Sequence, residues 1–288
     1  MRIALLHNPS AGAEDHSLDE LSGTIRAAGH DLRIAVDRIA ELTAALHRDP
    51  CELVVVAGGD GTVGRAACAL AGWRVPLSIV PLGTANNTAR ALGLPAGAKK
   101  LAKSWSTAKR VDFDLGLLGD GVLRHRFAEG AGWGVFPETI ALAKRKKKSG
   151  VAQTLRRDRK LFRDTARAML PRPYGIEIDG RDVSGDYILV EIMNVSQLGP
   201  QLALSSASDP GDGRLELVLA GAEQRSALER LAKTGELEAG ALRLERGSHI
   251  RIQASQGLHH RDGRVERHAL GARTFELGVE AAAVSYLV

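Results

Sequence analysis

The sequence lacks the features that mark membrane-spanning, secreted or nucleic-acid-binding proteins. Its 288 residues include two cysteines, Cys51 and Cys68, whose spacing fits no metal site and which a cytosolic protein would keep reduced. No apolar run approaches the roughly 18 residues of a membrane-spanning helix, and the run after Met1 is too short for a signal peptide. Aromatic residues make up 4% of the chain, which leaves few platforms for stacking nucleic-acid bases. We therefore expect a cytoplasmic protein with no nucleic-acid partner.

Internal repeats and flexible linkers are missing as well. The hydrophobic fraction of 44% and the charged fraction of 25% are those of an ordinary globular protein. A chain of 288 residues suggests two domains. Because no stretch rich in Gly, Pro or Ser separates them, we expect the two domains to abut and to share a cleft.

Short apolar runs alternate with helical periodicity through residues 1–111. This alternation predicts an open parallel α/β sheet covered by helices on both faces. The predicted strands cover residues 2–7, 32–36, 53–57 and 77–80, and the predicted helices residues 18–28, 39–46, 63–70 and 86–92.

The hydrophobic period changes from 3.6 to 2 residues near Arg110. Residues 111–117 alternate, and the Gly-Asp-Gly sequence at residues 119–121 is typical of a hairpin turn. We therefore predict that residues 112–288 form a mainly antiparallel β-sandwich domain, with a basic helical insertion at about residues 136–170. Further predicted strands lie at residues 176–181, 187–195, 215–220, 250–252 and 275–279.

The most informative motif is Gly-Gly-Asp-Gly-Thr at residues 58–62, between a buried strand and a helix. Glycines let backbone N–H groups approach an anion, and a helix N-terminus adds favourable partial charge. A tight turn without a ligand is the plain alternative. Neither the Walker pattern nor the dinucleotide GxGxxG pattern is present, so the motif favours neither a P-loop ATPase nor a dehydrogenase.

Two further loops follow neighbouring predicted strands. One is Asn-Pro-Ser-Ala-Gly at residues 8–12, and the other is the segment at residues 81–87, whose polar side chains could also cap the next helix. Carboxyl ends of parallel strands meet at one edge of a sheet, where ligands bind. The residues expected to contact a nucleotide phosphate are Asn8, Pro9, Gly12, Gly58, Gly59, Asp60, Gly61, Thr62, Gly83, Thr84 and Asn86.

These three loops resemble the successive motifs of the diacylglycerol kinase catalytic-domain family, which includes bacterial soluble lipid kinases and sphingosine kinases. Later segments resemble that family in the same order, at residues 111–112, 129–134, 199–200, 209–215 and 261–264. The resemblance implies a fold like that of NAD kinase and diacylglycerol kinase. It also implies ATP as phosphoryl donor, Mg²⁺, and a lipid with a free hydroxyl as acceptor.

The resemblance also implies roles for carboxylates. Asp60 would lie beside the phosphates, and Asp262, in the position of the family's late Asp-Gly-Glu motif, would be a base or a metal-associated carboxylate. Arg264 stands where the family has its catalytic glutamate, and Glu266 is a displaced substitute on the same side of an extended strand. Alternatively Asp60 or Asp262 acts alone, with Arg264 binding a phosphate, or the kinase is weak or inactive. We expect Asp262→Asn to abolish activity and Glu266→Gln to reduce it.

The Asp-Pro-Gly-Asp-Gly segment at residues 209–213 is a strong turn signal by itself. The resemblance implies a structural Mg²⁺ here, held by the carboxylate of Asp212, with Asp209 nearby, and by main-chain carbonyls such as that of Arg214. Hard oxygen ligands suit this ion.

Basic residues concentrate between Lys144 and Arg172, although the formal net charge is only +5. The stretch is either a solvated helix face or a surface attracted to anionic lipid headgroups. For a kinase with a lipid acceptor, the second reading predicts peripheral contact with the inner membrane surface. The oligomeric state stays open, a homodimer included.

Two other functions remain open at this stage. NAD kinases resemble the first domain, but the Thr-Gly-Ser-Thr-Ala-Tyr segment of that family is absent from this sequence. Arg264 in place of the catalytic glutamate would also suit a non-catalytic sensor of nucleotides or phospholipids.

Overall fold

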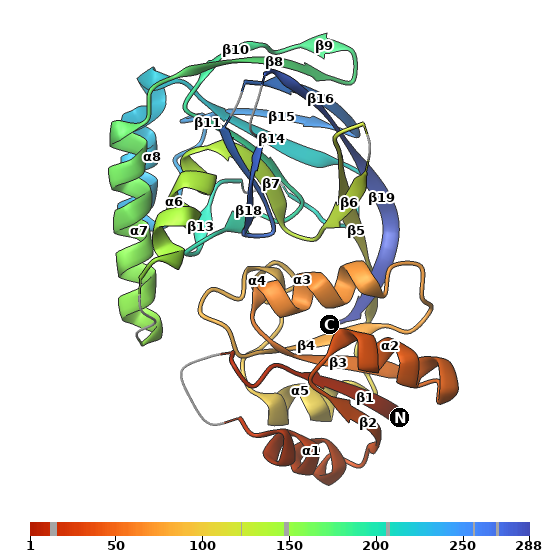
Figure 1. Ribbon diagram of the computed structural model, residues 1–288. Helices are drawn as coiled ribbons and strands as arrows, with labels where there is room; N and C mark the ends of the chain where they lie inside the picture. The colour runs from red at the N-terminus through yellow and green to blue at the C-terminus, as the bar shows by residue number, and fades with distance from the viewer. Residues whose placement is uncertain (12–15, 122, 147–149, 206–207, 256, 269–270) are drawn as a thin grey trace. The chain divides into compact units, whose positions relative to one another are not determined.

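The computed structural model describes residues 1–11, 16–121, 123–146, 150–205, 208–255, 257–268 and 271–288 (Figure 1). The chain divides into two compact units, Met1–Phe113 with Ala282–Val288, and Asp114–Ala281. The sequence-based division assigned the C-terminal seven residues to the second domain, and that assignment was wrong. They belong to the first unit because Tyr286 pairs in parallel with Leu77 and its ring lies 5.1 Å from that of Phe113.

The first unit is a parallel sheet with helices on both faces, which confirms the predicted class. Its strands pair in the order β4-β3-β1-β2. Helices α1 and α5 cover one face and α2 and α3 the other (Figure 1). The strands are β1 (Arg2–His7), β2 (Asp31–Val36), β3 (Leu53–Gly58) and β4 (Leu77–Pro81), and the helices are α1 (Leu18–Ala27), α2 (Ile39–Arg48), α3 (Asp60–Ala69), α4 (Asn87–Ala91) and α5 (Ala98–Ser104).

The core of the first unit explains its uninterrupted apolar strands. All six residues of β3 are buried, because a central parallel strand has helices on both faces. On one face, Ile3 and Val55 pack in a cluster with Leu21 and Ile25 from α1. The central strands are thereby fixed, and the loops at their carboxyl ends are held at one edge of the sheet.

The second unit is a two-sheet sandwich, as the period-2 pattern predicted. One layer is a six-stranded sheet with the antiparallel order β15-β14-β11-β7-β17-β18, and β10, β8, β16 and the first part of β19 form the facing layer. The strands are β5 (Arg110–Gly119), β6 (Arg124–Phe127), β7 (Gly130–Gly134), β8 (Arg172–Ile178), β9 (Arg181–Asp182), β10 (Gly185–Tyr187), β11 (Leu189–Met193), β12 (Gln197–Leu198), β13 (Leu202–Ala203), β14 (Leu215–Ala220), β15 (Arg243–Gly247), β16 (His249–Ala254), β17 (Gly257–Arg261), β18 (Arg264–His268) and β19 (Arg273–Leu287).

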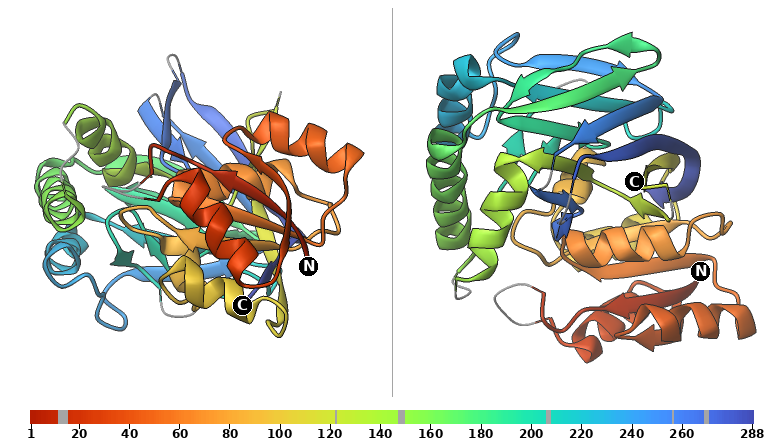
Figure 2. Two further views of the ribbon diagram at one scale, coloured as in Figure 1. Left: turned by 90° about the horizontal axis from the view of Figure 1, so that it is seen from below. Right: turned by 45° about the horizontal axis from the view of Figure 1, so that its top comes forward.

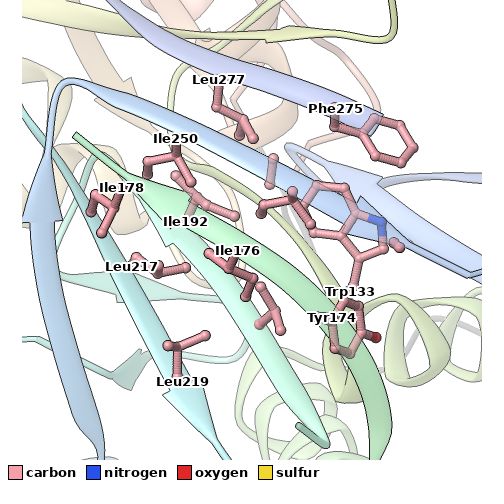
Figure 3. Close-up of a cluster of buried hydrophobic side chains, with 14 of the residues drawn as sticks. Trp133, Tyr174, Ile176, Ile178, Ile192, Leu217, Leu219, Ile250, Phe275 and Leu277 are labelled. Carbon is pink, nitrogen blue, oxygen red and sulfur yellow. The ribbon is translucent and has the colours of Figure 1, made fainter. Parts of the chain in front are cut away.

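Alternate residues of the two layers meet in one buried cluster (Figure 3). Trp133 and Ile192 come from the six-stranded sheet, and Ile176, Ile250 and Phe275 come from the facing layer. This alternation between inward apolar and outward polar side chains is the arrangement expected of a sandwich.

Three helices lie against one another beside the six-stranded sheet, with α7 between α6 and α8 (Figure 2). Phe136 of α6 and Phe162 of α7 are buried with ring centroids 5.0 Å apart. The predicted helical stretch at residues 136–170 comprises α6 and α7, whereas α5 and α8 were not predicted. Among the described residues, no helix is long and apolar enough to cross a membrane. The helices of this unit are α6 (Val135–Lys144), α7 (Val151–Ala168), η1 (Ala222–Gln224) and α8 (Arg225–Thr234).

Candidate functional site

The glycine motif forms the junction between β3 and α3. Gly59 is the N-cap of α3 and offers no side chain to the helix N-terminus. A Cβ on Gly58 would lie 2.8 Å from the Cβ of Thr62, so this turn requires glycine. Because no side chain caps α3, its N-terminus can take an anionic ligand in that role.

The loop after β4 contacts this junction through its backbone. A Cβ on Gly83 would lie 2.5 Å from the Cα of Gly59. Asn86 has a φ of 53°, accepts from the Gly83 N–H at 2.8 Å and donates to the Gly83 carbonyl at 2.9 Å. Asn86 therefore shapes its own loop and does not cap α4.

Side chains also connect the loops that follow β1, β3 and β4. The Asn8 side-chain amide donates to the Thr62 hydroxyl at 2.7 Å. The Thr88 N–H donates to the Asp60 carboxylate at 3.4 Å. The structure thus brings together residues 8, 58–62, 83 and 86, all within the first unit.

The remaining predicted contacts are less defined. Pro9 is exposed in a turn, and Thr84 is half-buried in a bend. Gly12 lies outside the described residues. Gly61 is exposed, and a Cβ placed there would meet only the Arg65 guanidinium, at 3.7 Å. A phosphate can therefore approach the backbone at Gly61 without displacing protein atoms.

In the second unit, Asp262 occupies the tight turn between β17 and β18. Its φ of 44° and that of Gly263, 70°, are both left-handed. The Asp262 carboxylate accepts N–H bonds from Ala128, Glu129 and Gly130 at 2.8, 2.8 and 3.2 Å. Burial raises the pKa of the Asp262 carboxyl, and these donors partly oppose that shift. The contacts give Asp262 a role in holding the segment before β7, and its role as a base stays a prediction.

Glu266, the displaced substitute, lies among arginines. Its carboxylate is 3.2 Å from Nε of Arg264 and 3.8 Å from a guanidinium nitrogen of Arg261. Its side chain is 39% exposed. Both arginines already engage this carboxylate, so Glu266 is a weaker candidate base than the sequence suggested.

The carboxylates of the acidic turn, residues 209–214, contact N–H groups and a guanidinium of the protein itself. Asp209 accepts from the Gly211 N–H at 3.0 Å, and Asp212 accepts from the Arg214 N–H at 2.9 Å. The other Asp212 oxygen contacts the Arg246 guanidinium. In the part of the chain that the structure describes, no group of three or more His, Cys, Asp or Glu side chains could hold a metal ion. The contacts of the turn therefore do not fit the structural Mg²⁺ that the resemblance implies.

Two buried polar residues that sequence reasoning passed over organise this region. The Asp114 carboxylate accepts from the Gly213 N–H at 2.7 Å, and the Asp114 N–H donates to the Pro210 carbonyl at 2.6 Å. The Asn194 amide donates to the carbonyls of Asp114 and Ala128, at 2.9 and 3.0 Å. For Asn194 the available signal was a polar residue within an apolar strand, whereas Asp114 stands at a polar position of an alternating strand and gave no such signal.

A third overlooked residue is Glu191, a fully buried carboxylate in β11. Its oxygens lie 3.0 and 3.1 Å from Nε2 of His260. Burial raises the pKa of Glu191, and His260 opposes that shift. A Cβ on Gly132 would lie 2.0 Å from a Glu191 oxygen. The glycines of β7 therefore make room for this side chain.

Gly132→Ala is expected to destabilise the second unit by about 2 kcal/mol, because the new methyl group overpacks a buried site and displaces Glu191 from His260. Urea unfolding followed by circular dichroism measures the loss. Gly150→Ala is the matched control, since a Cβ there meets nothing within 4 Å. Equal stability of the Gly132 and Gly150 variants would contradict the expectation.

Most basic side chains of α7 have partners within the chain. Lys160 and Arg163 contact Asp164, and Arg167 contacts Glu229. Arg159 donates to the carbonyls of Pro200 and Gln201, which are not acidic groups. Beside α7, the basic residues Lys144, Arg145 and Lys146 at the C-terminal end of α6 are all exposed.

Comparisons with known proteins agree with this architecture. The sequence profile of the diacylglycerol kinase catalytic domain matches residues 2–118. A diacylglycerol kinase of Mycobacterium tuberculosis is 28% identical over 67% of this chain, and the chain spans only 62% of that relative. A Pectobacterium atrosepticum protein named "Probable lipid kinase YegS-like" is 30% identical over 75% of this chain and 72% of its own length.

Solved structures share the fold. A diacylglycerol kinase from Bacillus anthracis superposes with a TM-score of 0.74 at 18% identity, covering 99% of this chain and 96% of that one. Yeast NADH kinase gives a TM-score of 0.58 at 14% identity, covering 100% and 83% of the two chains. The predicted similarity to both kinase folds is confirmed.

Proposed function

Because this chain belongs to the diacylglycerol kinase catalytic-domain family, we propose that it is an ATP-dependent lipid kinase that transfers the γ-phosphoryl group to a hydroxyl of a lipid such as diacylglycerol. The observation that carries the proposal is the mutual contact of the three loops that follow β1, β3 and β4. These loops place an uncapped helix N-terminus, glycine backbone and one carboxylate at the carboxyl edge of a parallel sheet. That edge is where open α/β sheets bind ligands.

Phosphoryl transfer depends mainly on positioning and on electrostatic stabilisation of the phosphates. The backbone of residues 59–61 would contact phosphate oxygens, and Thr62, already fixed by Asn8, would keep the loop in place. Mg²⁺ brought with ATP would supply positive charge to the transferring phosphoryl group. Asp60 is the carboxylate of this loop and would face either that ion or the attacking hydroxyl.

Transfer of radiolabelled γ-phosphate from ATP to a total lipid extract tests the proposal. We expect a labelled lipid, identified by chromatography and mass spectrometry, and loss of labelling in Asp60→Asn with ATP binding retained. Thermal shift with ATP checks the binding of both forms. A parallel reaction with NAD in place of the lipid extract tests the other enzyme: label in NAD and not in lipid would show an NAD kinase, and ATP binding without any transfer would favour the sensor.

Asp262→Asn is expected to abolish lipid phosphorylation and also to lower the melting temperature. An amide offers one oxygen where the carboxylate offers two, so the N–H groups of residues 128–130 lose acceptors, at about 1–3 kcal/mol for each buried donor left unpaired. Activity and thermal unfolding should therefore be measured on the same preparation. Glu266→Gln is the companion variant, expected to keep the melting temperature and part of the activity. Wild-type turnover in Asp262→Asn would contradict the prediction.

We further propose that the exposed cluster Lys144, Arg145 and Lys146 contacts anionic lipid headgroups at the inner membrane surface. Each basic residue near such a surface contributes about 1 kcal/mol, screened by salt. Vesicle sedimentation at low and high salt should show salt-sensitive binding that is lost when all three become Gln. Lys160→Gln is the control, because Asp164 already neutralises Lys160. Equal sedimentation of the triple variant would count against this surface.

A further inference from the structure

The acidic turn at residues 209–214 is paired with a cationic side chain of the same protein, that of Arg246. We propose that Arg246 occupies the role of a bound divalent ion, so that the turn folds without a metal. The register of the six-stranded sheet places Arg246 directly opposite Glu216, in the pairing of β14 with β15. The position of this guanidinium is therefore fixed by strand pairing and not by a loop.

The Arg246 guanidinium lies close to two carboxylates. One guanidinium nitrogen contacts Asp212, and Nε lies 3.6 Å from Glu216, whose side chain is 4% exposed. Ser208 donates to the other oxygen of Glu216 at 2.7 Å. A buried carboxylate requires a nearby positive charge or hydrogen-bond donors, and Arg246 and Ser208 provide both.

Two further oxygens of the turn are also engaged. The second Asp212 oxygen accepts the Arg214 N–H, and the Pro210 carbonyl accepts the Asp114 N–H. Mg²⁺ requires near-octahedral oxygen ligands at about 2.1 Å, usually with carboxylates free to bind it. An ion at Asp212 would first have to displace Arg246.

The turn that Arg246 contacts is also linked by hydrogen bonds to residues outside it. Gly213 donates to Asp114, and Asn194 links the Asp114 carbonyl to that of Ala128. The Ala128 N–H in turn donates to Asp262. Hydrogen bonds thus run from the turn held by Arg246 to the loop that Asp262 holds, which makes Arg246 a positioning residue for the late motif.

Thermal unfolding of the full chain without nucleotide or lipid tests the inference, so its result does not depend on the proposed kinase activity. At constant ionic strength, we expect the wild-type melting temperature to change by less than about 1 °C between Mg²⁺ and EDTA. Arg246→Leu should melt at a lower temperature and should regain part of the loss in Mg²⁺, because Asp212 becomes free to bind it. Amide exchange at residues 128–130 should be faster in this variant.

Two further variants complete the test. Arg243→Leu, on the same strand, removes a contact with Glu245 only and should leave both the Mg²⁺ response and the exchange at residues 128–130 unchanged. Arg246→Lys keeps the charge and should stay insensitive to Mg²⁺ even if Arg246→Leu fails to fold. A wild-type melting temperature that rises with Mg²⁺, with the rise lost in Asp212→Asn, would overturn the inference. The inference would also be overturned if Mg²⁺ raised the melting temperature of Arg246→Lys by as much as that of Arg246→Leu, or by more.

Discussion

Gly83→Ala is expected to weaken ATP binding about 100-fold, the loss of about 3 kcal/mol that one or two hydrogen bonds to charged phosphate oxygens contribute. The new Cβ would lie 2.5 Å from the Cα of Gly59 and 2.8 Å from the Asn86 side-chain oxygen. The first contact is with backbone, so no rotamer change can relieve it. The two loops would have to separate, and the N-terminus of α3 would move with them.

Isothermal titration with ATP and Mg²⁺ measures the effect, with the melting temperature as a check on folding. Gly23→Ala in α1 is the matched control, because its Cβ meets nothing within 4 Å and alanine favours a helix. Gly61→Ala separates protein contacts from ligand contacts. A Cβ at residue 61 makes no close contact with protein atoms, so weaker ATP binding at an unchanged melting temperature would indicate that ATP binds next to Gly61. Wild-type affinity in Gly83→Ala would mean that loop contact is not needed for binding.

The site in the first unit could be predicted from sequence because its chemistry follows from local order. Buried strands at residues 53–57 and 77–80 end in glycine loops, and parallel strands end at the same edge. The sequence could not predict the contact between Gly59 and Gly83. A close approach of two backbone segments requires glycine, but a glycine in the sequence does not show which segment it will contact. Asn86 shows the same limit, because the sequence does not distinguish an asparagine that caps a helix from one whose side chain holds its own loop.

The second unit was harder to predict because its interactions are long-range. The three N–H donors to Asp262 lie more than 130 residues earlier in the chain. Arg246 meets Asp212 only through strand register, which no local pattern specifies. The basic stretch of α7 was visible as charge, but its neutralisation by residues such as Glu229 depends on the packing of α7 against α8.

Glu191 illustrates a signal that was present and not used. It interrupts an otherwise apolar strand, and a charged residue in such a strand requires a buried partner. The glycine-rich β7 was assigned to a family motif without a structural reason. The structure supplies that reason, because the Glu191 side chain occupies the space that a side chain at Gly132 would need.

Acid is expected to destabilise the second unit through His259. The His259 side chain is 9% exposed, and Nδ1 has no hydrogen-bond partner among the described residues. Burial lowers the pKa of His259 from 6.5 to about 4, with opposing attraction from Glu266. Because the folded-state pKa lies below the unfolded value, this contribution to stability is complete above pH 6.5 and is lost as the pH falls toward 4. At about 1.4 kcal/mol per pKa unit, the loss at pH 4 is about 3 kcal/mol.

Urea unfolding at a series of pH values from 7 to 4 measures this loss, and His259→Phe isolates it. Phenylalanine keeps ring contacts with Trp133 and Phe275, whose centroids lie 5.9 and 5.1 Å from that of His259, and it does not titrate. The wild type should therefore lose about 3 kcal/mol more than the variant across this range. Carboxyl groups such as Glu191 titrate in both proteins and cancel in the difference. His125→Phe, at an exposed position, should follow the wild type. Parallel pH profiles for wild type and His259→Phe would show that His259 is protonated in the folded chain without cost, and the burial argument would fail.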